Sequence, residues 1–275
     1  MPAAFRLDPV HRERLRLAAA ILALDRHADA WLLLLPALWA TWLASRGAPN
    51  VSALVALMLA YGLARAALWA WYVPGATSPE GIPPQRRRMG LMLFTAALCF
   101  AVPLGWPVLM VTLSTALCVA WFALRRHSYL AQPALAAAPA LAVAAAWSAQ
   151  AAAPGKALGL LGLAAFLWVL AALVTRLPDR HGASLAGAFG PHVPLLVAAL
   201  LGSALLALHM LGNQAGLGVF HRLGLAVAGL LTVGSVLRLA RDDGPGAYVL
   251  QMWWGAAVFA GLGTHFLCAC AVPAV

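Results

Sequence analysis

The chain has 275 residues, of which 64% are hydrophobic and only 9% charged, and its mean hydropathy is +0.87. Soluble domains carry about 25% charged residues, so this composition excludes a water-soluble globular protein and indicates an integral membrane protein. The formal net charge of +10 arises from seventeen arginines and one lysine against eight acids. In a chain this apolar we interpret that charge as a determinant of membrane topology, and we expect no nucleic-acid partner.

The N-terminal stretch is basic, and we expect residues 1–29 to form a cytoplasmic segment. A secretory signal would combine a short apolar segment with a small-residue cleavage site. The apolar run that begins here continues well past that size, so the first helix is expected to remain as an anchor. Residues Val10 to Leu24 mix charge with Leu and Ile at near-helical spacing, a pattern compatible with a helix along the membrane surface.

Nine apolar spans follow, each long enough or nearly long enough to cross a bilayer as a helix. The spans are Ala30–Ala44, Val51–Val73, Met89–Leu104, Trp106–Leu124, Pro133–Gln150, Ala157–Val174, His192–Gly212, Leu217–Leu239 and Tyr248–Ala271. A lipid-exposed backbone must satisfy its own hydrogen bonds, so we predict that all nine are helical. The runs are continuously apolar and do not alternate with polar residues, which disfavours a β-barrel.

Basic residues are distributed unevenly between the connections. Fourteen precede the first span or lie in or near every second connection, whereas only Arg46, Lys156 and Arg222 lie in or near the other connections. Cytoplasmic connections carry the excess of Lys and Arg. The pattern therefore predicts an all-α, multi-pass protein with a cytoplasmic N-terminus and a periplasmic C-terminus.

Arg65 is the exception, because it lies inside the second span. An intramembrane arginine costs at least about 2.5–3.5 kcal/mol on insertion scales and normally faces the protein interior or a wet cavity. We interpret Arg65 as a functional or cavity-lining residue; snorkelling to the cytoplasmic edge is the alternative. The four cysteines, in contrast, are interpreted as small buried hydrophobes. These are Cys99, Cys118, Cys268 and Cys270.

Several motifs in chain order resemble the UbiA-type intramembrane prenyltransferases, in particular the bacterial 4-hydroxybenzoate polyprenyltransferases of ubiquinone synthesis. LLLLPALWATWLA at Leu32–Ala44 is similar to the family's first helix, and Arg65-Ala66-Ala67 is similar to the Arg-Ala-Ala before its first aspartate motif. WFALRRHSYLAQ at 121–132 resembles its Tyr-x-x-x-Lys-Arg segment, and RDDGPGAY at 241–248 resembles its last turn. The resemblance implies one UbiA-like domain over residues 1–275, a nine-helix bundle with a central cavity.

The same resemblance implies Mg²⁺-assisted transfer of a polyprenyl group from its diphosphate to an aromatic ring, with two Asp-rich motifs as metal ligands. The first motif is absent, since its acidic positions fall on Val73 and Ala76 and only Glu80 lies nearby. The second is eroded to Asp179. The family's Lys-Pro-x-Gly near the N-terminus is replaced by residues 26–29, Arg-His-Ala-Asp. Glu80 and Asp179 are therefore weak metal-ligand candidates, and Mg²⁺ is expected only if the protein is active.

The cytoplasmic mouth of the expected bundle is basic. Candidates for binding a diphosphate or an anionic lipid are Arg65, Arg125, Arg126 and Arg180. For the basic pair, and for Arg86–Arg88, the alternative is that they set topology and contact anionic headgroups, each worth about 1 kcal/mol near the surface.

Two functions are compatible with this sequence. The first is a degenerate homologue in the bacterial inner membrane that has become a pseudoenzyme, binding a polyprenyl lipid or a quinone precursor or supporting an active relative. The second is an active aromatic prenyltransferase that handles the diphosphate through arginines with Glu80 or Asp179. A lipid carrier ranks last, because the internal repeats and broken helices typical of transporters are not evident.

Overall fold

The computed structural model describes residues 27–71, 84–124, 129–151, 155–176 and 185–241, and all regular structure in these ranges is helical. Eight helices of 18 to 23 residues and a few short helical turns make up the fold. The elements are α2 (His27–Ala44), α3 (Val51–Trp71), α4 (Pro84–Ala101), η1 (Val102–Leu104), α5 (Trp106–Leu124), α6 (Ala131–Gln150), α7 (Lys156–Arg176), α8 (Leu185–Phe189), η2 (Gly190–His192), α9 (Val193–Gln214) and α10 (Val219–Arg241).

These eight long helices coincide with the first eight predicted spans to within a few residues. The largest shift is at α4, which begins at Pro84, so Arg86–Arg88 lie in its first turns and not in a loop. The sequence analysis also missed α8 and η2, which lie between α7 and α9. The ninth predicted span, Tyr248–Ala271, lies outside the described residues.

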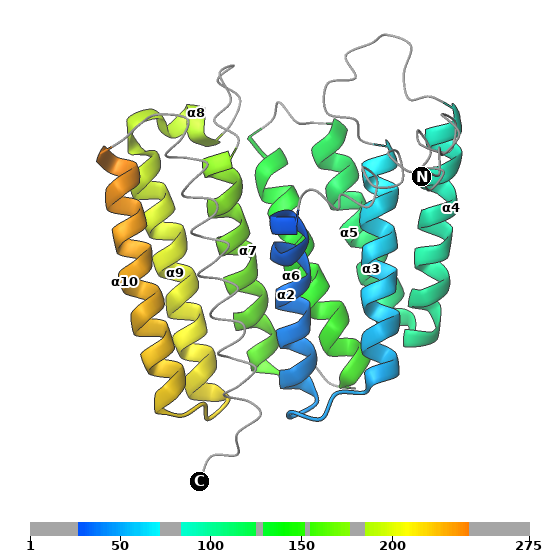
Figure 1. Ribbon diagram of the computed structural model, residues 1–275, viewed down its shortest axis with the longest axis horizontal. Helices are drawn as coiled ribbons and strands as arrows, with labels where there is room; N and C mark the ends of the chain where they lie inside the picture. Colours follow the sequence, from blue (N-terminus) through cyan, green and yellow to red (C-terminus); the bar gives the residue numbers. More distant parts are fainter. Residues whose placement is uncertain (1–26, 72–83, 125–128, 152–154, 177–184, 242–275) are drawn as a thin grey trace, which may run out of the picture.

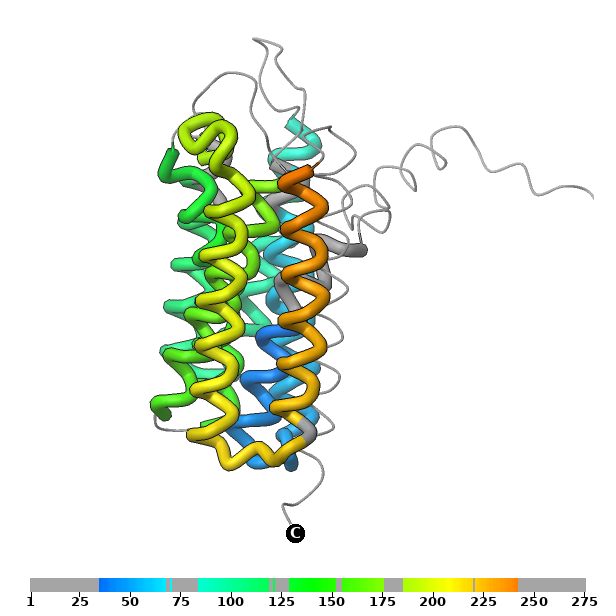
Figure 2. Tube along the Cα trace, turned by 90° about the vertical axis from the view of Figure 1, so that its left-hand side faces the viewer, coloured from blue at the N-terminus to red at the C-terminus, as the bar shows by residue number. Residues whose placement is uncertain are grey.

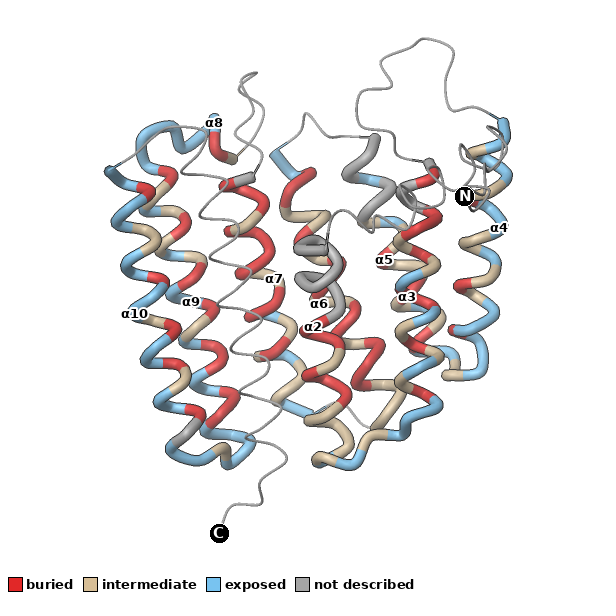
Figure 3. The backbone as a smooth tube through the Cα atoms, in the orientation of Figure 1, coloured by how far each residue is buried: buried red, intermediate tan, exposed pale blue. Residues whose placement is uncertain are grey.

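The long helices stand side by side, with α10 and α4 at opposite ends of the row (Figure 1). Figure 2, turned by 90° from Figure 1, shows that the axes of the long helices run roughly parallel to one another. Helix α6 lies at the centre of this arrangement and packs extensively against α2, α5 and α7. Its buried positions are mostly alanines, which allow neighbouring backbones to approach closely on several sides. Buried residues accordingly concentrate on the central helices (Figure 3).

The outer helices α4 and α10 expose large apolar side chains. Examples are Leu91 and Met92 on α4, and Leu230 and Leu237 on α10. Among the described residues, four helical segments are long and apolar enough to cross a bilayer by length and composition, and three shorter helices are also apolar. Exposed apolar faces on helices of this length suit a lipid environment. Cys99 lies on such a face of α4 and is exposed, so the prediction that the cysteines are buried was wrong for this residue; Cys118 is partly buried.

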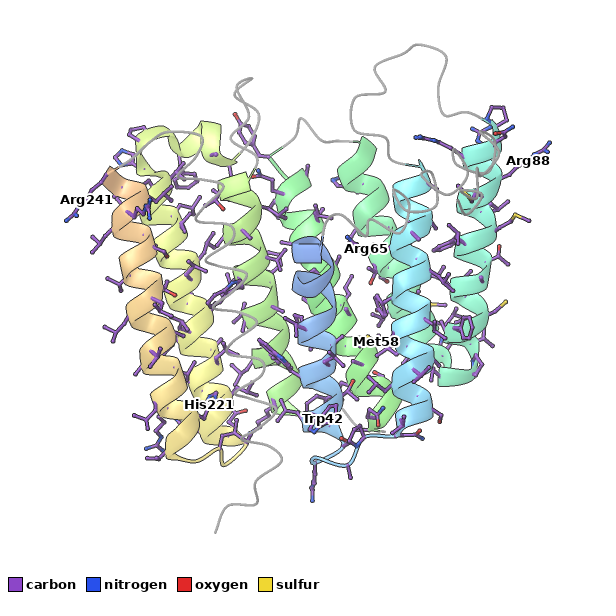
Figure 4. All side chains as sticks on the ribbon, in the orientation of Figure 1. Trp42, Met58, Arg65, Arg88, His221 and Arg241 are labelled. Atoms are coloured by element: carbon purple, nitrogen blue, oxygen red, sulfur yellow. The ribbon has the colours of Figure 1, made fainter. Side chains whose placement is uncertain are left out.

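Sharp turns join the helices at the end of the bundle away from Arg88 and Arg241 (Figure 4). After α9 the N–H of Leu217 donates to the carbonyl of Gly212 at 2.8 Å. Gly216 has a positive φ of 69° in this turn. This bond pattern is a Schellman motif, which requires a left-handed residue after the helix and therefore favours glycine. It turns the chain directly from α9 into α10, so these two helices pack as a hairpin.

Candidate functional site

Arg65 lies in the last third of α3, on the same side of the helix as Tyr61 one turn earlier. Figure 4 shows Arg65 on the side of α3 that faces the bundle, away from α4. The residue as a whole is partly exposed, but its Nη2 atom is buried. A guanidinium held against the interior of an apolar bundle is a strong donor for anionic or carbonyl oxygens. Arg65 therefore faces the protein interior, and its role as a binding or cavity-lining residue stays a prediction.

Tyr61 brings a phenol to the interface between α3 and α5, where its side chain is 2% exposed. Its hydroxyl lies beside the hydroxyls of Thr112 and Thr115, but no contact within the described residues has full hydrogen-bond geometry. Both threonines donate to their own helix, Thr112 to the Val108 carbonyl at 2.8 Å and Thr115 to the Val111 carbonyl at 2.9 Å. The interface between α3 and α5 therefore contains a small hydroxyl cluster below Arg65.

Gln132 is a second buried polar residue, in the first turn of α6, and it is 4% exposed. Its Oε1 accepts a hydrogen bond from the backbone N–H of Leu185, the first residue of α8, at 3.1 Å. Its Nε2 is buried and has no hydrogen-bond partner among the described residues. Sequence analysis did not single out Gln132, although a glutamine at the start of a long apolar helix is a usable signal.

The other predicted site residues lie outside the described residues: Arg125, Arg126, Asp179, Arg180 and Glu80. Their segments, 72–83, 125–128 and 177–184, are each flanked by helix ends at the end of the bundle that α8 occupies (Figure 1). The helix ends that flank these segments therefore lie at the end of the bundle nearer Arg65.

Arg86–Arg88 occupy a different environment. They lie on α4 at the edge of the bundle, where Arg87 and Arg88 are exposed. Arg88 points away from the other helices (Figure 4). This position favours the alternative proposed for the cluster, contact with lipid headgroups and a role in topology.

The residues present do not fit the two Asp-rich metal motifs of the family. The eight acids of the chain are Asp8, Glu13, Asp25, Asp29, Glu80, Asp179, Asp242 and Asp243. Helices α3 to α10 therefore contribute no carboxylate, and the described residues contain no group of three potential His, Cys, Asp or Glu ligands. Magnesium prefers several oxygen ligands in octahedral geometry. Glu80 and Asp179, each the single acid of its segment, form too small a set to hold Mg²⁺ in that geometry.

The helix arrangement is similar to that of solved intramembrane prenyltransferases. The structure of digeranylgeranylglyceryl phosphate synthase superposes with a TM-score of 0.73 at 10% identity, covering 94% of this chain and 99% of that chain. A UbiA homologue from Aeropyrum pernix K1 superposes with a TM-score of 0.68 at 16% identity, covering 87% and 98%. A UbiA homologue from Archaeoglobus fulgidus, bound to Cd²⁺, gives 0.60 at 15% identity, covering 88% and 99%. The protein therefore has the UbiA-type fold.

No family model matches the chain. The 4-hydroxybenzoate octaprenyltransferase of Nitrosococcus oceani is 30% identical over 94% of this chain and 100% of its own length. The enzyme of the same name from Hahella chejuensis is 30% identical over 93% and 94%. The chain belongs to the UbiA family of prenyltransferases, and it is similar over nearly its full length to relatives named 4-hydroxybenzoate octaprenyltransferase. The resemblance predicted from the motifs is confirmed.

Proposed function

We propose that the protein binds a polyprenyl lipid within a UbiA-type bundle and has lost the metal-dependent transfer reaction. The diphosphate or other anionic head group would lie at the end of the bundle that Arg65 faces. The isoprenoid chain would lie along the apolar helices or in the surrounding bilayer. Relatives named octaprenyltransferases support the choice of an isoprenoid ligand.

The observation that carries this proposal is the inward position of Arg65, whose Nη2 is buried on the side of α3 facing the bundle. Guanidinium groups bind phosphate oxygens through two parallel hydrogen bonds, and these bonds are stronger in a dry site than in water. A guanidinium whose Nη2 is buried therefore favours an anionic ligand over a neutral one. Arg125, Arg126 and Arg180 would add charge from the neighbouring segments.

The missing carboxylates argue against transfer. Departure of a diphosphate requires its developing negative charge to be neutralised, and removal of one positioned group of that kind commonly lowers a rate by about 10²–10³. Here only Glu80 and Asp179 remain near the positions of two ligand motifs. We infer that this protein acts by binding an isoprenoid lipid or a quinone precursor, or by supporting an active relative in the same membrane.

The second candidate is an active aromatic prenyltransferase that transfers a polyprenyl group to 4-hydroxybenzoate or a similar ring. The specific observation in its favour is that the curated relatives carry that activity in their names over nearly the full chain. In this mechanism arginines would bind the leaving diphosphate, and Glu80 or Asp179 would be the remaining acids of the site.

Both candidates share one membrane arrangement. We propose nine spans in a bacterial inner membrane, formed by the eight long helices together with Tyr248–Ala271. The N-terminus would be cytoplasmic and the C-terminus periplasmic. The positive-inside rule supports this orientation, because the described basic residues at the α8 end outnumber those at the other end.

One experiment tests the function. The purified protein in lipid nanodiscs is incubated with 4-hydroxybenzoate and a long polyprenyl diphosphate, with and without Mg²⁺. Mass spectrometry then detects both the prenylated product and lipid retained on the protein. We expect retained lipid without product. Product that depends on Arg65 would overturn the binding hypothesis in favour of the enzyme.

Arg65→Ala provides the mechanistic control. Loss of a charge-assisted contact to the head group should weaken retention of the diphosphate by about tenfold or more. Arg238→Ala is the matched variant, because Arg238 is an exposed arginine on the edge helix α10 at the same end of the bundle. Equal retention by the wild type and both variants would show that Arg65 does not bind the ligand.

A further inference from the structure

We propose that Gln132 is part of the anion site, and that its Nε2 group donates a hydrogen bond to an oxygen of the bound diphosphate. This inference rests on the proposed function, because it adds a residue at the α8 end of the bundle to the proposed diphosphate site.

Only one end of the Gln132 carboxamide has a hydrogen-bond partner among the described residues. Oε1 accepts the Leu185 N–H at 3.1 Å, which fixes the orientation of the amide plane. Nε2 is consequently held in a defined direction, buried, and without an acceptor among the described residues. Buried donors are nearly always satisfied, because an unsatisfied one loses its hydration without compensation. An oriented, buried donor of this kind indicates an acceptor that is supplied by a ligand.

The Nε2 donor lies at the start of α6, where backbone N–H groups also lack intrahelical acceptors. Leu130 precedes α6 as N-cap without a side-chain cap, and the first backbone bond of the helix is Ala134 N–H to the Leu130 carbonyl. Residue 133 is proline and has no N–H. The N–H groups of Ala131 and Gln132 therefore have no intrahelical acceptor, and they carry the positive end of a 20-residue helix dipole. Such helix starts attract phosphate and carboxylate oxygens.

Gln132 and its partner Leu185 each follow a part of the sequence that contains candidate arginines. Arg125 and Arg126 come shortly before Gln132 in the chain. Leu185, its hydrogen-bond partner, directly follows the segment that contains Asp179 and Arg180. The hydrogen bond between Gln132 and Leu185 therefore joins the start of α6 to the start of α8.

Gln132→Glu separates the two functions of this side chain. The introduced carboxyl group retains an acceptor for the Leu185 N–H, but it replaces the free donor by a second acceptor. We expect geranylgeranyl diphosphate to bind the variant about tenfold or more weakly than the wild type in nanodiscs. Inorganic pyrophosphate should lose the ability to compete to a similar degree. Binding of geranylgeraniol, which has no phosphate, should stay unchanged.

Two further variants make the result decisive. Gln214→Glu adds the same charge at an exposed position on α9, at the opposite end of the bundle, and should bind diphosphate like the wild type. Gln132→Met removes both the acceptor and the donor. If Gln132 only holds α8 in place, the methionine variant will bind diphosphate more weakly than the glutamate variant. If Gln132 donates to the ligand, the glutamate variant will bind at least as weakly as the methionine variant.

The possible failures are distinguishable. A wild-type protein that binds no diphosphate would overturn the proposed function itself. A wild-type protein that binds it, with undiminished binding by Gln132→Glu, would overturn only the role of Gln132. Equal losses for the diphosphate and for geranylgeraniol would also overturn that role, because they would indicate a structural defect without preference for the anion.

Discussion

Gly212 shows how tightly one residue can be fixed in this bundle. The imidazole of His221, which is 4% exposed, lies against the Cα of Gly212, so a Cβ at this position would overlap the ring. The His221 Nε2 is also 3.2 Å from the Leu208 carbonyl, which limits how far the ring can move. Glycine at position 212 is therefore required by packing between α9 and α10.

Gly212→Ala should lower the apparent melting temperature in detergent, because overpacking a close contact costs about 1–3 kcal/mol. Gly202→Ala is the internal control, since it lies in the same helix and an added Cβ has nothing within 4 Å. That substitution should be neutral or slightly stabilising, by up to about 1 kcal/mol. Equal melting temperatures for the two variants would contradict the packing argument.

Of the individual residues in the candidate site, the sequence predicted only some. Arg65 stood out because a charge inside an apolar span is costly and therefore informative. Tyr61 and Thr112 did not, because hydroxyl residues are common in membrane helices and their spacing says nothing about which helices meet. Gln132 was visible within a motif, but its importance depends on Leu185, which is 53 residues later in the chain. Contacts of that kind appear only once the helices are packed.

Among the elements, the start of α3 is stabilised by a hydrogen-bonded cap at Asn50. The Asn50 Oδ1 accepts the Ala53 N–H at 3.2 Å and the Ser52 hydroxyl at 2.7 Å, which makes Asn50 the helix cap. The Asn50 backbone also exchanges two hydrogen bonds with the Gln150 side chain at the end of α6, at 2.9 and 3.2 Å. One turn therefore both begins α3 and joins it to the central helix.

Asn50→Ala should destabilise the protein by about 0.5–2 kcal/mol, because it removes the cap while leaving the backbone bonds to Gln150 available. Asn50→Ser, which can still cap, should recover most of that stability. Thermal unfolding of the detergent-solubilised protein measures both. A serine variant as unstable as the alanine variant would show that capping is not the contribution of Asn50.

Most helix boundaries were predicted to within two residues, and the start of α4 is the largest miss. Gly105 has a φ of 99° and separates η1 from α5, as the predicted break between Leu104 and Trp106 required. The start of α4 was missed because hydropathy reports the lipid-facing part of a helix, whereas Pro84 can begin a helix in a polar stretch. Hydropathy also gives no signal for α8, a helix of 5 residues.

For the whole molecule, the alternating directions of the helices agree with the distribution of basic residues between the two ends of the bundle. The described helices alternate in direction, so Arg88 and Arg241 lie at one end of the bundle and His221 near the other (Figure 4). The sequence predicted this alternation because each long apolar run must cross the bilayer once. It could not predict that α6 would be the central helix, since an alanine-rich helix is recognised as central only from the neighbours packed around it. Which side of the membrane each end faces is still a proposal.

Lys156 allows that proposal to be tested on the intact protein. It is the single lysine of the chain, is exposed, and begins α7 at the end of the bundle opposite α8. If the N-terminus is cytoplasmic, a membrane-impermeant amine reagent added to right-side-out spheroplasts will modify Lys156, and inverted vesicles will protect it. Peptide mass spectrometry locates the label, and Lys156→Arg, which keeps the charge, should abolish it. Labelling of Lys156 from inverted vesicles alone would reverse the orientation, and the arginine-rich end with the proposed diphosphate site would then face the periplasm.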